Sequence, residues 1–174
     1  MSLQLDHSTH SESEKKFPIV ILTDNITGEA NIGSLFRLAD AFNIEKILFS
    51  GTPINLKSNR LRRTARGTFE KVVFEHTENI LETIENYKAK SYMAVALEIT
   101  SDSVALDVLK LKNDSKVLLI IGNERHGISQ LVLDAIQTKV HIPMFGNNSS
   151  MNVSQATGIA LYEFSKTFLN FRQK

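Results

Sequence analysis

The chain has 174 residues, of which 42% are hydrophobic and 22% are charged, and its formal net charge is +1. This length and composition are typical of one globular domain with its own core. Because the net charge is near zero, overall charge gives no argument for nucleic-acid binding, and such an argument must come from local clusters. The absence of cysteine excludes disulfides, thiolate catalysis and cysteine-based zinc sites, and it fits a cytoplasmic protein.

Residues 1–16 are rich in Ser, His and Glu and lack periodicity, which predicts a flexible tail before a single domain over 17–174. No apolar run reaches the ~18 residues that a membrane span needs, and no signal peptide is recognisable. We therefore expect no membrane partner.

Short apolar runs typical of strands alternate with amphipathic segments typical of helices. Strands are predicted at 17–23, 45–49, 69–75, 92–99, 116–121 and 139–143. Helices are predicted at 31–42, 77–88, 129–136 and 152–171. Thr77 is a candidate N-cap for the second helix. Because the strands are apolar along nearly their whole length, the pattern predicts an α/β fold with a mostly parallel sheet covered by helices on both faces.

A polar loop follows the most apolar predicted strand and has the sequence Gly122-Asn123-Glu124-Arg125-His126-Gly127-Ile128-Ser129. Its position between a strand and a helix suits a phosphate loop, but Ile128 stands where such a loop needs lysine, and Glu124 would repel a polyphosphate. The loop therefore favours a neutral or cationic ligand held by backbone groups. The alternative is a tight glycine turn in which Glu124 is structural.

A second polar segment begins the first predicted helix and reads Asn31-Ile32-Gly33-Ser34-Leu35-Phe36-Arg37. Arg37 lies about 200° around the helix from Leu35, so it leaves the core face, and taken alone it is a solvated charge. Gly33 costs about 1 kcal/mol in a helix relative to Ala. It therefore indicates close approach of another backbone or of a ligand.

The third polar segment lies between the last predicted strand and the last helix, where Ser150-Met151-Asn152-Val153-Ser154 follows a loop of glycine, asparagine and serine. One Ser or Asn would cap the helix in any case. The segment has more such side chains than a cap needs, which favours a ligand site at this strand end and helix start.

Together the three segments resemble the motifs of the SpoU/TrmH family of RNA 2′-O-ribose methyltransferases, in the SPOUT superfamily. Asn31-x5-Arg37-x2-Asp40-Ala41 is similar to the first motif, and Gly122-Asn123-Glu124-x2-Gly127-Ile128-Ser129 to the second. The third motif is similar to Ile142-Pro143-Met144-x-Gly146-x3-Ser150-Met151-Asn152-Val153-Ser154-x-Ala156. Met151 replaces the more usual Leu, an apolar change of similar volume that should be mild. The resemblance covers about 17–169.

The resemblance implies a C-terminal trefoil knot, a homodimer, S-adenosyl-L-methionine bound in the knot, no metal, and methylation of a ribose 2′-hydroxyl of tRNA or rRNA. It implies a cofactor site bordered by Leu97, Gly122, Ile142 and Met151. It implies a reacting centre formed by Asn31, Arg37, Glu124, Ser150 and Asn152.

The family assigns proton removal to the arginine of the first motif, but a guanidinium stays protonated above pH 12. We expect instead that Arg37 stabilises the developing alkoxide and the adjacent phosphate, reaching toward RNA bound with the partner subunit. A phosphate is an alternative proton acceptor. His126 is expected to be a loop residue and His141 a half-buried strand residue, neither of them catalytic.

A basic segment precedes the third predicted strand and places five cations within ten residues: Lys57, Arg60, Arg62, Arg63 and Arg66. In a near-neutral chain this cluster predicts a phosphate-binding strip for RNA. The alternative is an ordinary solvated loop.

Two other functions compete with methyl transfer. A non-catalytic RNA-binding module of the same fold would need a missing reacting-centre residue, and none is missing. A nucleotide-dependent oxidoreductase would need Gly-x-Gly-x-x-Gly after the first strand, which the chain lacks. No separate N-terminal RNA-binding domain is recognisable, which favours a tRNA-type enzyme, while the target nucleotide and its position stay open.

Overall fold

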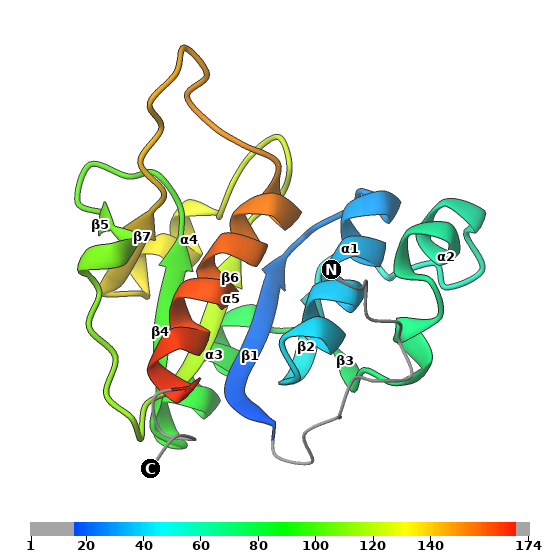
Figure 1. The fold of residues 1–174 in the computed structure, drawn as a ribbon, viewed down its shortest axis with the longest axis horizontal. Coiled ribbons are helices and arrows are strands. Elements are labelled where there is room, and N and C mark those ends of the chain that lie inside the picture. The colour runs from blue at the N-terminus through cyan, green and yellow to red at the C-terminus, as the bar shows by residue number, and fades with distance from the viewer. Residues whose placement is uncertain (1–15, 170–174) are drawn as a thin grey trace, which may run out of the picture.

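The computed structural model describes residues 16–169, in which one seven-stranded sheet has the order β3-β2-β1-β6-β4-β7-β5 (Figure 1). Every strand pairing in it is parallel. The strands are β1 (Phe17–Asp24), β2 (Ile44–Ser50), β3 (Phe74–Thr77), β4 (Tyr92–Leu97), β5 (Val104–Ala105), β6 (Lys116–Ile121) and β7 (Thr138–His141). The predicted parallel sheet is confirmed.

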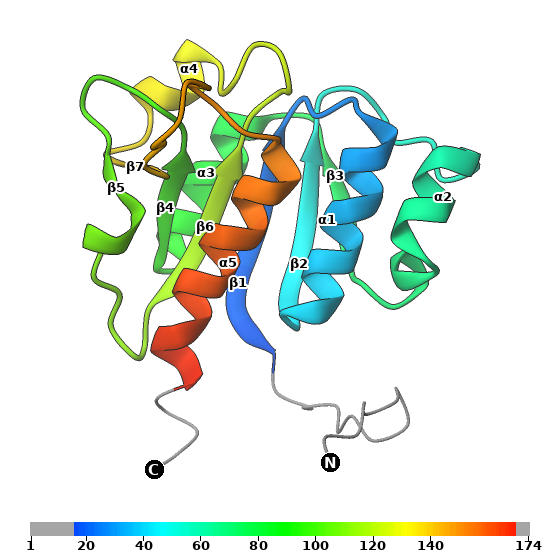
Figure 2. The same cartoon turned by 45° about the horizontal axis from the view of Figure 1, so that its top comes forward.

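Helices cover both faces of this sheet (Figure 2). One face carries α1 (Glu29–Ala41) and α5 (Val153–Leu169), with α2 (Asn59–Ala65) packed against α1. The other face carries α3 (Ile80–Ala89) and α4 (Gln130–Asp134). Two short 3-10 helices, η2 (Thr68–Glu70) and η3 (Leu106–Val108), lie in the connections. The α/β class predicted from the sequence is therefore confirmed.

The central strands β1 and β6 carry the side chains that hold the layers together. Ile19 and Ile21 enter the core under α1 and α5, whereas Val20 and Leu22 enter the core under α3 and α4. All four are fully buried. An apolar side chain at every position is what a strand buried on both faces requires, because successive side chains point to opposite faces.

The segment before α3 differs from the prediction. The residues predicted to start a strand at 69 form η2, and β3 begins only at Phe74. Phe69 still packs against the core, but it does so from a 3-10 turn that follows the left-handed Gly67. Thr77 ends β3 and does not cap α3; the side chain of Asn79 accepts the cap hydrogen bond from Glu82.

Two short elements, α2 and β5, were not predicted at all. Helix α2 has only two buried residues, Leu61 and Ala65, and β5 has only two residues in total, so neither produces a recognisable period. Apart from Lys16, the predicted N-terminal tail lies outside the described residues, as do the last two residues of the predicted closing helix, 170 and 171. None of the helices between residues 16 and 169 is long and apolar enough to cross a membrane.

Parallel strands bring the loops that follow them to one edge of the sheet. The segments after β1, β4, β6 and β7 all emerge at this carboxyl edge, which is where open α/β sheets bind ligands. The three polar segments singled out in the sequence are thereby placed at the same end of the molecule.

Candidate functional site

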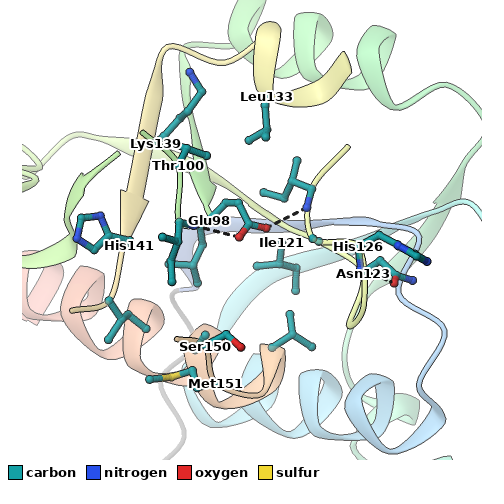
Figure 3. Close-up of a pocket in the computed structure, with 18 of the residues that line it drawn as sticks. Glu98, Thr100, Ile121, Asn123, His126, Leu133, Lys139, His141, Ser150 and Met151 are labelled. Atoms are coloured by element: carbon teal, nitrogen blue, oxygen red, sulfur yellow. Dashed lines mark hydrogen bonds between the residues drawn. The ribbon is translucent and has the colours of Figure 1, made fainter. Parts of the chain in front are cut away.

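The loops after β4, β6 and β7 border a cavity of about 970 Å³ at the carboxyl edge (Figure 3). The four residues expected to border a cofactor all line it: Leu97, Gly122, Ile142 and Met151. Three of the five residues expected at the reacting centre also line it: Glu124, Ser150 and Asn152. Segments that are far apart in the sequence therefore share one cavity.

The loop after β6 is a tight turn that requires glycine at its base. A Cβ on Gly122 would lie 2.2 Å from the carbonyl carbon of Gly127 and 2.2 Å from the nitrogen of Ile128. Asn123 and Gly127 exchange two backbone hydrogen bonds of 2.9 Å, and Gly127 has a φ of +66°. The turn is thus both a glycine turn and a wall of the cavity, so the two interpretations of this loop do not exclude each other.

Glu124 links this turn to the start of α1. Its carboxylate accepts hydrogen bonds from the backbone nitrogen of Gly28 (2.8 Å), the backbone nitrogen of Thr27 (3.3 Å) and the Nδ2 of Asn31 (2.9 Å). Burial by itself would raise the pKa of Glu124, but these hydrogen bonds outweigh it and lower the pKa below its usual value. Glu124 is therefore an ionised acceptor at neutral pH.

Asn31 connects Glu124 to the third motif. While its Nδ2 donates to Glu124, its Oδ1 accepts a hydrogen bond of 2.9 Å from the Nδ2 of Asn152. The Oδ1 of Asn152 in turn accepts from the backbone nitrogen and the hydroxyl of Ser154 in the first turn of α5. Glu124, Asn31 and Asn152 thus form one hydrogen-bonded chain across the three motifs, and both amide orientations follow from it.

A second cavity of about 460 Å³ adjoins the first. It is lined by the segment 27–31, by Asn152 and by Arg60 from α2. Asn152 lines both cavities, so it stands at their junction. A cation of the predicted RNA-binding strip therefore faces the same space as two residues of the predicted reacting centre.

Arg37 is placed differently from the other predicted centre residues. It is exposed on α1, as the helical spacing indicated, and it lines neither cavity. Within one subunit, the structure therefore does not bring Arg37 to the hydrogen-bonded residues Glu124, Asn31 and Asn152.

The five cations of the basic segment are all exposed. Four belong to α2 or its carboxyl end, so most of the segment is a helix and not a loop, while the exposure of its cations fits both a solvated segment and an RNA-binding strip. Leu61 and Ala65 of α2 are buried against α1, where a Cβ on Gly33 would lie 2.6 Å from the carbonyl oxygen of Leu61. The close backbone approach predicted at Gly33 is thus made by α2, and it turns the arginines outward.

Glu98 is a cavity residue that the sequence analysis missed. Its Oε2 accepts a hydrogen bond of 3.0 Å from the nitrogen of Ile128, and its Oε1 accepts one of 3.0 Å from the nitrogen of Ile99 (Figure 3). Glu98 therefore fixes the turn after β6 to the end of β4. A carboxylate directly after an apolar strand was the signal that could have identified it.

The remaining polar wall of the cavity comes from the neighbourhood of β7. Lys139 pairs with Asp102 at 2.8 Å, and its hydrogen bond lowers the pKa of Asp102. His141 is half-buried, as expected, and its Nδ1 lies 3.0 Å from the hydroxyl of Ser103. His126 is an exposed loop residue, also as expected.

The charges that line the larger cavity are mostly negative. Its carboxylates are Glu98, Asp102, Glu124 and Asp134, and its fixed cations are Arg125 and Lys139. Four negative charges against two positive ones favour a ligand with a positive charge. No group of three or more His, Cys, Asp or Glu side chains suited to a metal ion occurs between residues 16 and 169.

The family model described as the SpoU rRNA Methylase family matches residues 18–162. An uncharacterised tRNA/rRNA methyltransferase of Borreliella burgdorferi is 28% identical over 157 residues, which are 88% of this chain and 66% of the relative. A tRNA (guanosine(18)-2′-O)-methyltransferase of Aquifex aeolicus is 27% identical over 145 residues, which are 83% of this chain and 67% of the relative. The chain thus spans about two thirds of the length of these relatives.

Solved structures show the same fold. The TrmH/SpoU tRNA modifying enzyme of A. aeolicus has a TM-score of 0.78 at 25% identity, covering 88% of this chain and 76% of that one. An AdoMet-bound rRNA methyltransferase of Sinorhizobium meliloti has a TM-score of 0.79 at 24% identity, covering 87% of this chain and 57% of that one. At that identity the second likeness concerns the fold alone.

Proposed function

Since the chain belongs to the SpoU rRNA methylase family, we propose that it transfers a methyl group from S-adenosyl-L-methionine to a ribose 2′-hydroxyl of tRNA or rRNA. The observation that carries the proposal is the hydrogen-bonded chain of Glu124, Asn31 and Asn152 at the junction of the two cavities. These three residues come from three separate motifs, and a reaction between two substrates needs such a junction.

The larger cavity fits S-adenosyl-L-methionine in size and charge. Its volume of about 970 Å³ accommodates a nucleoside with an amino-acid side arm, and its excess of carboxylates favours a sulfonium cation. When bound, the cofactor supplies an activated methyl group together with its own leaving group. Leu97, Gly122, Ile142 and Met151 would hold it, largely through their backbone groups.

The smaller cavity suits the acceptor nucleotide. Arg60 provides a cation for a phosphate, and Asn31 and Asn152 lie on the side toward the cofactor cavity. The other exposed cations of the segment, on α2 and at its two ends, would extend the positive surface: Lys57, Arg62, Arg63 and Arg66. If an RNA strand binds along this helix, these cations neutralise its phosphates up to the junction of the two cavities.

The protein's part in the reaction is to hold the ribose in line with the methyl group and to stabilise the oxygen as its proton leaves. Glu124 keeps Asn31 in one orientation, and Asn152 fixes the start of α5, so neither amide needs to rotate during the reaction. Ser150 lies beside them on the wall of the larger cavity. We assign to Arg37 the stabilisation of the developing alkoxide and of the adjacent phosphate.

The position of Arg37 outside both cavities supports a homodimer in which each subunit supplies this arginine to its partner. Ile159 and Tyr162 of α5 are exposed apolar side chains that a second subunit would cover. The proposal further includes a single cytoplasmic domain over 17–174 with a C-terminal trefoil knot. The knot is supported by β6, which lies between β1 and β4, and by α5, which returns from beyond β4 to pack on α1.

Two measurements test the proposed reaction. S-adenosyl-L-methionine at 100 times its Kd should stabilise the fold by about 2.7 kcal/mol, which thermal unfolding detects. Total RNA from cells that lack the protein should show by mass spectrometry one lost ribose methyl group, restored by the purified enzyme. A restored methyl group on a base would refute ribose specificity. RNA binding without any response to the cofactor would support a non-catalytic RNA-binding module instead.

A further inference from the structure

The loop between β7 and α5, residues 142–152, projects from the body of the protein (Figure 1), and its one aromatic residue is Phe145. Phe145 is 97% exposed, more than any other large hydrophobic side chain between residues 16 and 169. A single exposed apolar residue needs no explanation by itself. The surroundings of Phe145 are what make it informative.

The chain on both sides of Phe145 lines the larger cavity. Ile142 and Met144 do so before it, and Ser150 and Met151 do so after it. Phe145 is therefore tethered at both ends to the rim of the proposed cofactor site.

The residues that follow Phe145 in the loop, 146–149, have no apolar side chain. Gly146, Asn147, Asn148 and Ser149 are all exposed, and within the described part of the chain none of the last three makes a side-chain hydrogen bond. A protein partner would favour apolar neighbours on all sides of a central aromatic residue, whereas the four residues after Phe145 carry no apolar side chain. An unpaired nucleotide base has a face that stacks on a phenyl ring and edges that hydrogen-bond to amides.

We propose that Phe145 stacks on an RNA base next to the methylated ribose, and that Asn147 and Asn148 contact the edges of that base. The inference rests on the proposed function, because the RNA must place one ribose at the junction of the two cavities. A nucleotide held there leaves its stack, and an aromatic surface at the rim compensates for the stacking that is lost.

The chain contains no tryptophan, so Phe145→Trp introduces a single fluorescent indole in this loop. The tRNA and rRNA fractions of cells that lack the protein serve as probes. We expect at least one fraction to quench the indole emission, while a fully paired RNA duplex does not. Val108→Trp is the matched control, because Val108 is 58% exposed on η3 and does not line the cavity. The proposal is overturned if both variants are quenched equally, or if the emission of Phe145→Trp is not quenched.

A second variant measures the contribution of the ring to RNA binding. Phe145→Ala should raise the Kd for the quenching RNA by roughly 5- to 150-fold, the range expected for one stacked base. Phe145→Tyr should keep most of the wild-type affinity for RNA. The Kd for S-adenosyl-L-methionine should be the same in all three proteins. If Phe145→Ala instead lowers the mass of the assembly in solution and leaves the RNA affinity as it was, a second subunit covers the ring and the proposal is wrong.

These readouts separate the inference from the function on which it rests. If S-adenosyl-L-methionine fails to stabilise any form of the protein, the methyl transfer is refuted whatever the indole shows. If the cofactor binds and RNA is methylated but the indole does not respond, only the stacking is refuted.

Discussion

At the scale of single residues, Glu124 anchors the start of α1, which has no side-chain cap of its own. Gly28 occupies the N-cap position and has no side chain to accept a hydrogen bond, and the carboxylate of Glu124 accepts from the nitrogens of Gly28 and Thr27 instead. A negative charge at a helix N-terminus is also favourable because of the helix dipole. One residue thus joins the stability of α1 to the geometry of the site.

Glu124→Gln should destabilise the fold by about 1 kcal/mol at neutral pH, a value reduced from that of a buried charged hydrogen bond because Glu124 is largely exposed. The folded-state pKa lies below the ordinary 4.5, so the contribution of the charge is complete above pH 4.5 and is lost as the pH falls through the folded-state pKa. Denaturant unfolding of both proteins at several pH values measures the difference. It should shrink in acid.

Glu82→Gln is the control for this prediction. Glu82 is exposed in the first turn of α3, and its replacement is chemically the same as that of Glu124. Unlike Glu124, it holds no other loop in place. Its effect should be the smaller of the two. A deficit of Glu124→Gln that stays constant down to pH 3 would show that the charge is irrelevant.

Arg37→Lys should lower kcat by at least tenfold while leaving the Kd for S-adenosyl-L-methionine as it is. Lysine keeps the charge but loses the planar fork that binds an alkoxide and a phosphate together. Arg37 is exposed and lines neither cavity in one chain, so the fold should tolerate the change. Single-turnover methylation with saturating cofactor measures the effect. Near-normal turnover would rule out a role that depends on the fork.

At the scale of elements, α2 is a short helix whose placement depends on α1. Leu61 and Ala65 fit against α1 because Gly33 has no side chain, and Ser58 caps the helix by accepting from the nitrogen of Leu61. With its apolar residues buried, the arginines of α2 are exposed, and Arg60 lines the smaller cavity. The packing of two helices thus produces a positive surface at the site.

Replacing Arg60 and Arg63 with glutamine should flatten the salt dependence of RNA binding. Each phosphate contact contributes about 0.7 to 0.9 to the slope of log K against log salt concentration, so the slope should fall by about 1.4 to 1.8. Lys110→Gln with Lys112→Gln is the matched control, because both lysines are exposed and neither lines a cavity. If the two double variants give the same slope, the basic segment is no RNA-binding strip.

At the scale of the whole molecule, the parallel sheet places the three motifs at one edge, but Arg37 lies away from the other residues of the predicted centre. The loops after β6 and β7 meet the start of α1 through Glu124, Asn31 and Asn152, but Arg37 points away from them on an exposed side of α1. The proposed centre therefore includes a second copy of the chain, with α1 of one subunit approaching the cavities of the other.

Mixing two inactive variants tests this arrangement. Arg37→Ala and Asn152→Ala should each be nearly inactive alone, and subunit exchange should restore activity to about a quarter of the wild-type value. Random exchange places both intact residues together at one of the two sites in half of the dimers. Methylation before and after refolding the variants as a mixture measures the recovery. Absence of recovery, with exchange verified by mass, would place each arginine in its own subunit's site.

The sequence alone determined the class of the fold, because continuously apolar runs such as 17–23 and 116–121 alternate with amphipathic helical segments. It also identified every residue of the chain formed by Glu124, Asn31 and Asn152, through their motifs. It misplaced the third strand and missed α2, because Phe69 and Leu61 are anchored by tertiary contacts that leave no local period.

Only the tertiary structure decided how these residues act together. The sequence does not show what the two carboxylates contact: Glu98 fixes the turn after β6, and Glu124 fixes the start of α1. The junction of the two cavities at Asn152, with Arg60 facing it, joins segments about 90 residues apart. Local sequence records which backbone each residue prefers, whereas hydrogen bonds between distant loops depend on the order of strands in the sheet, which no local pattern specifies.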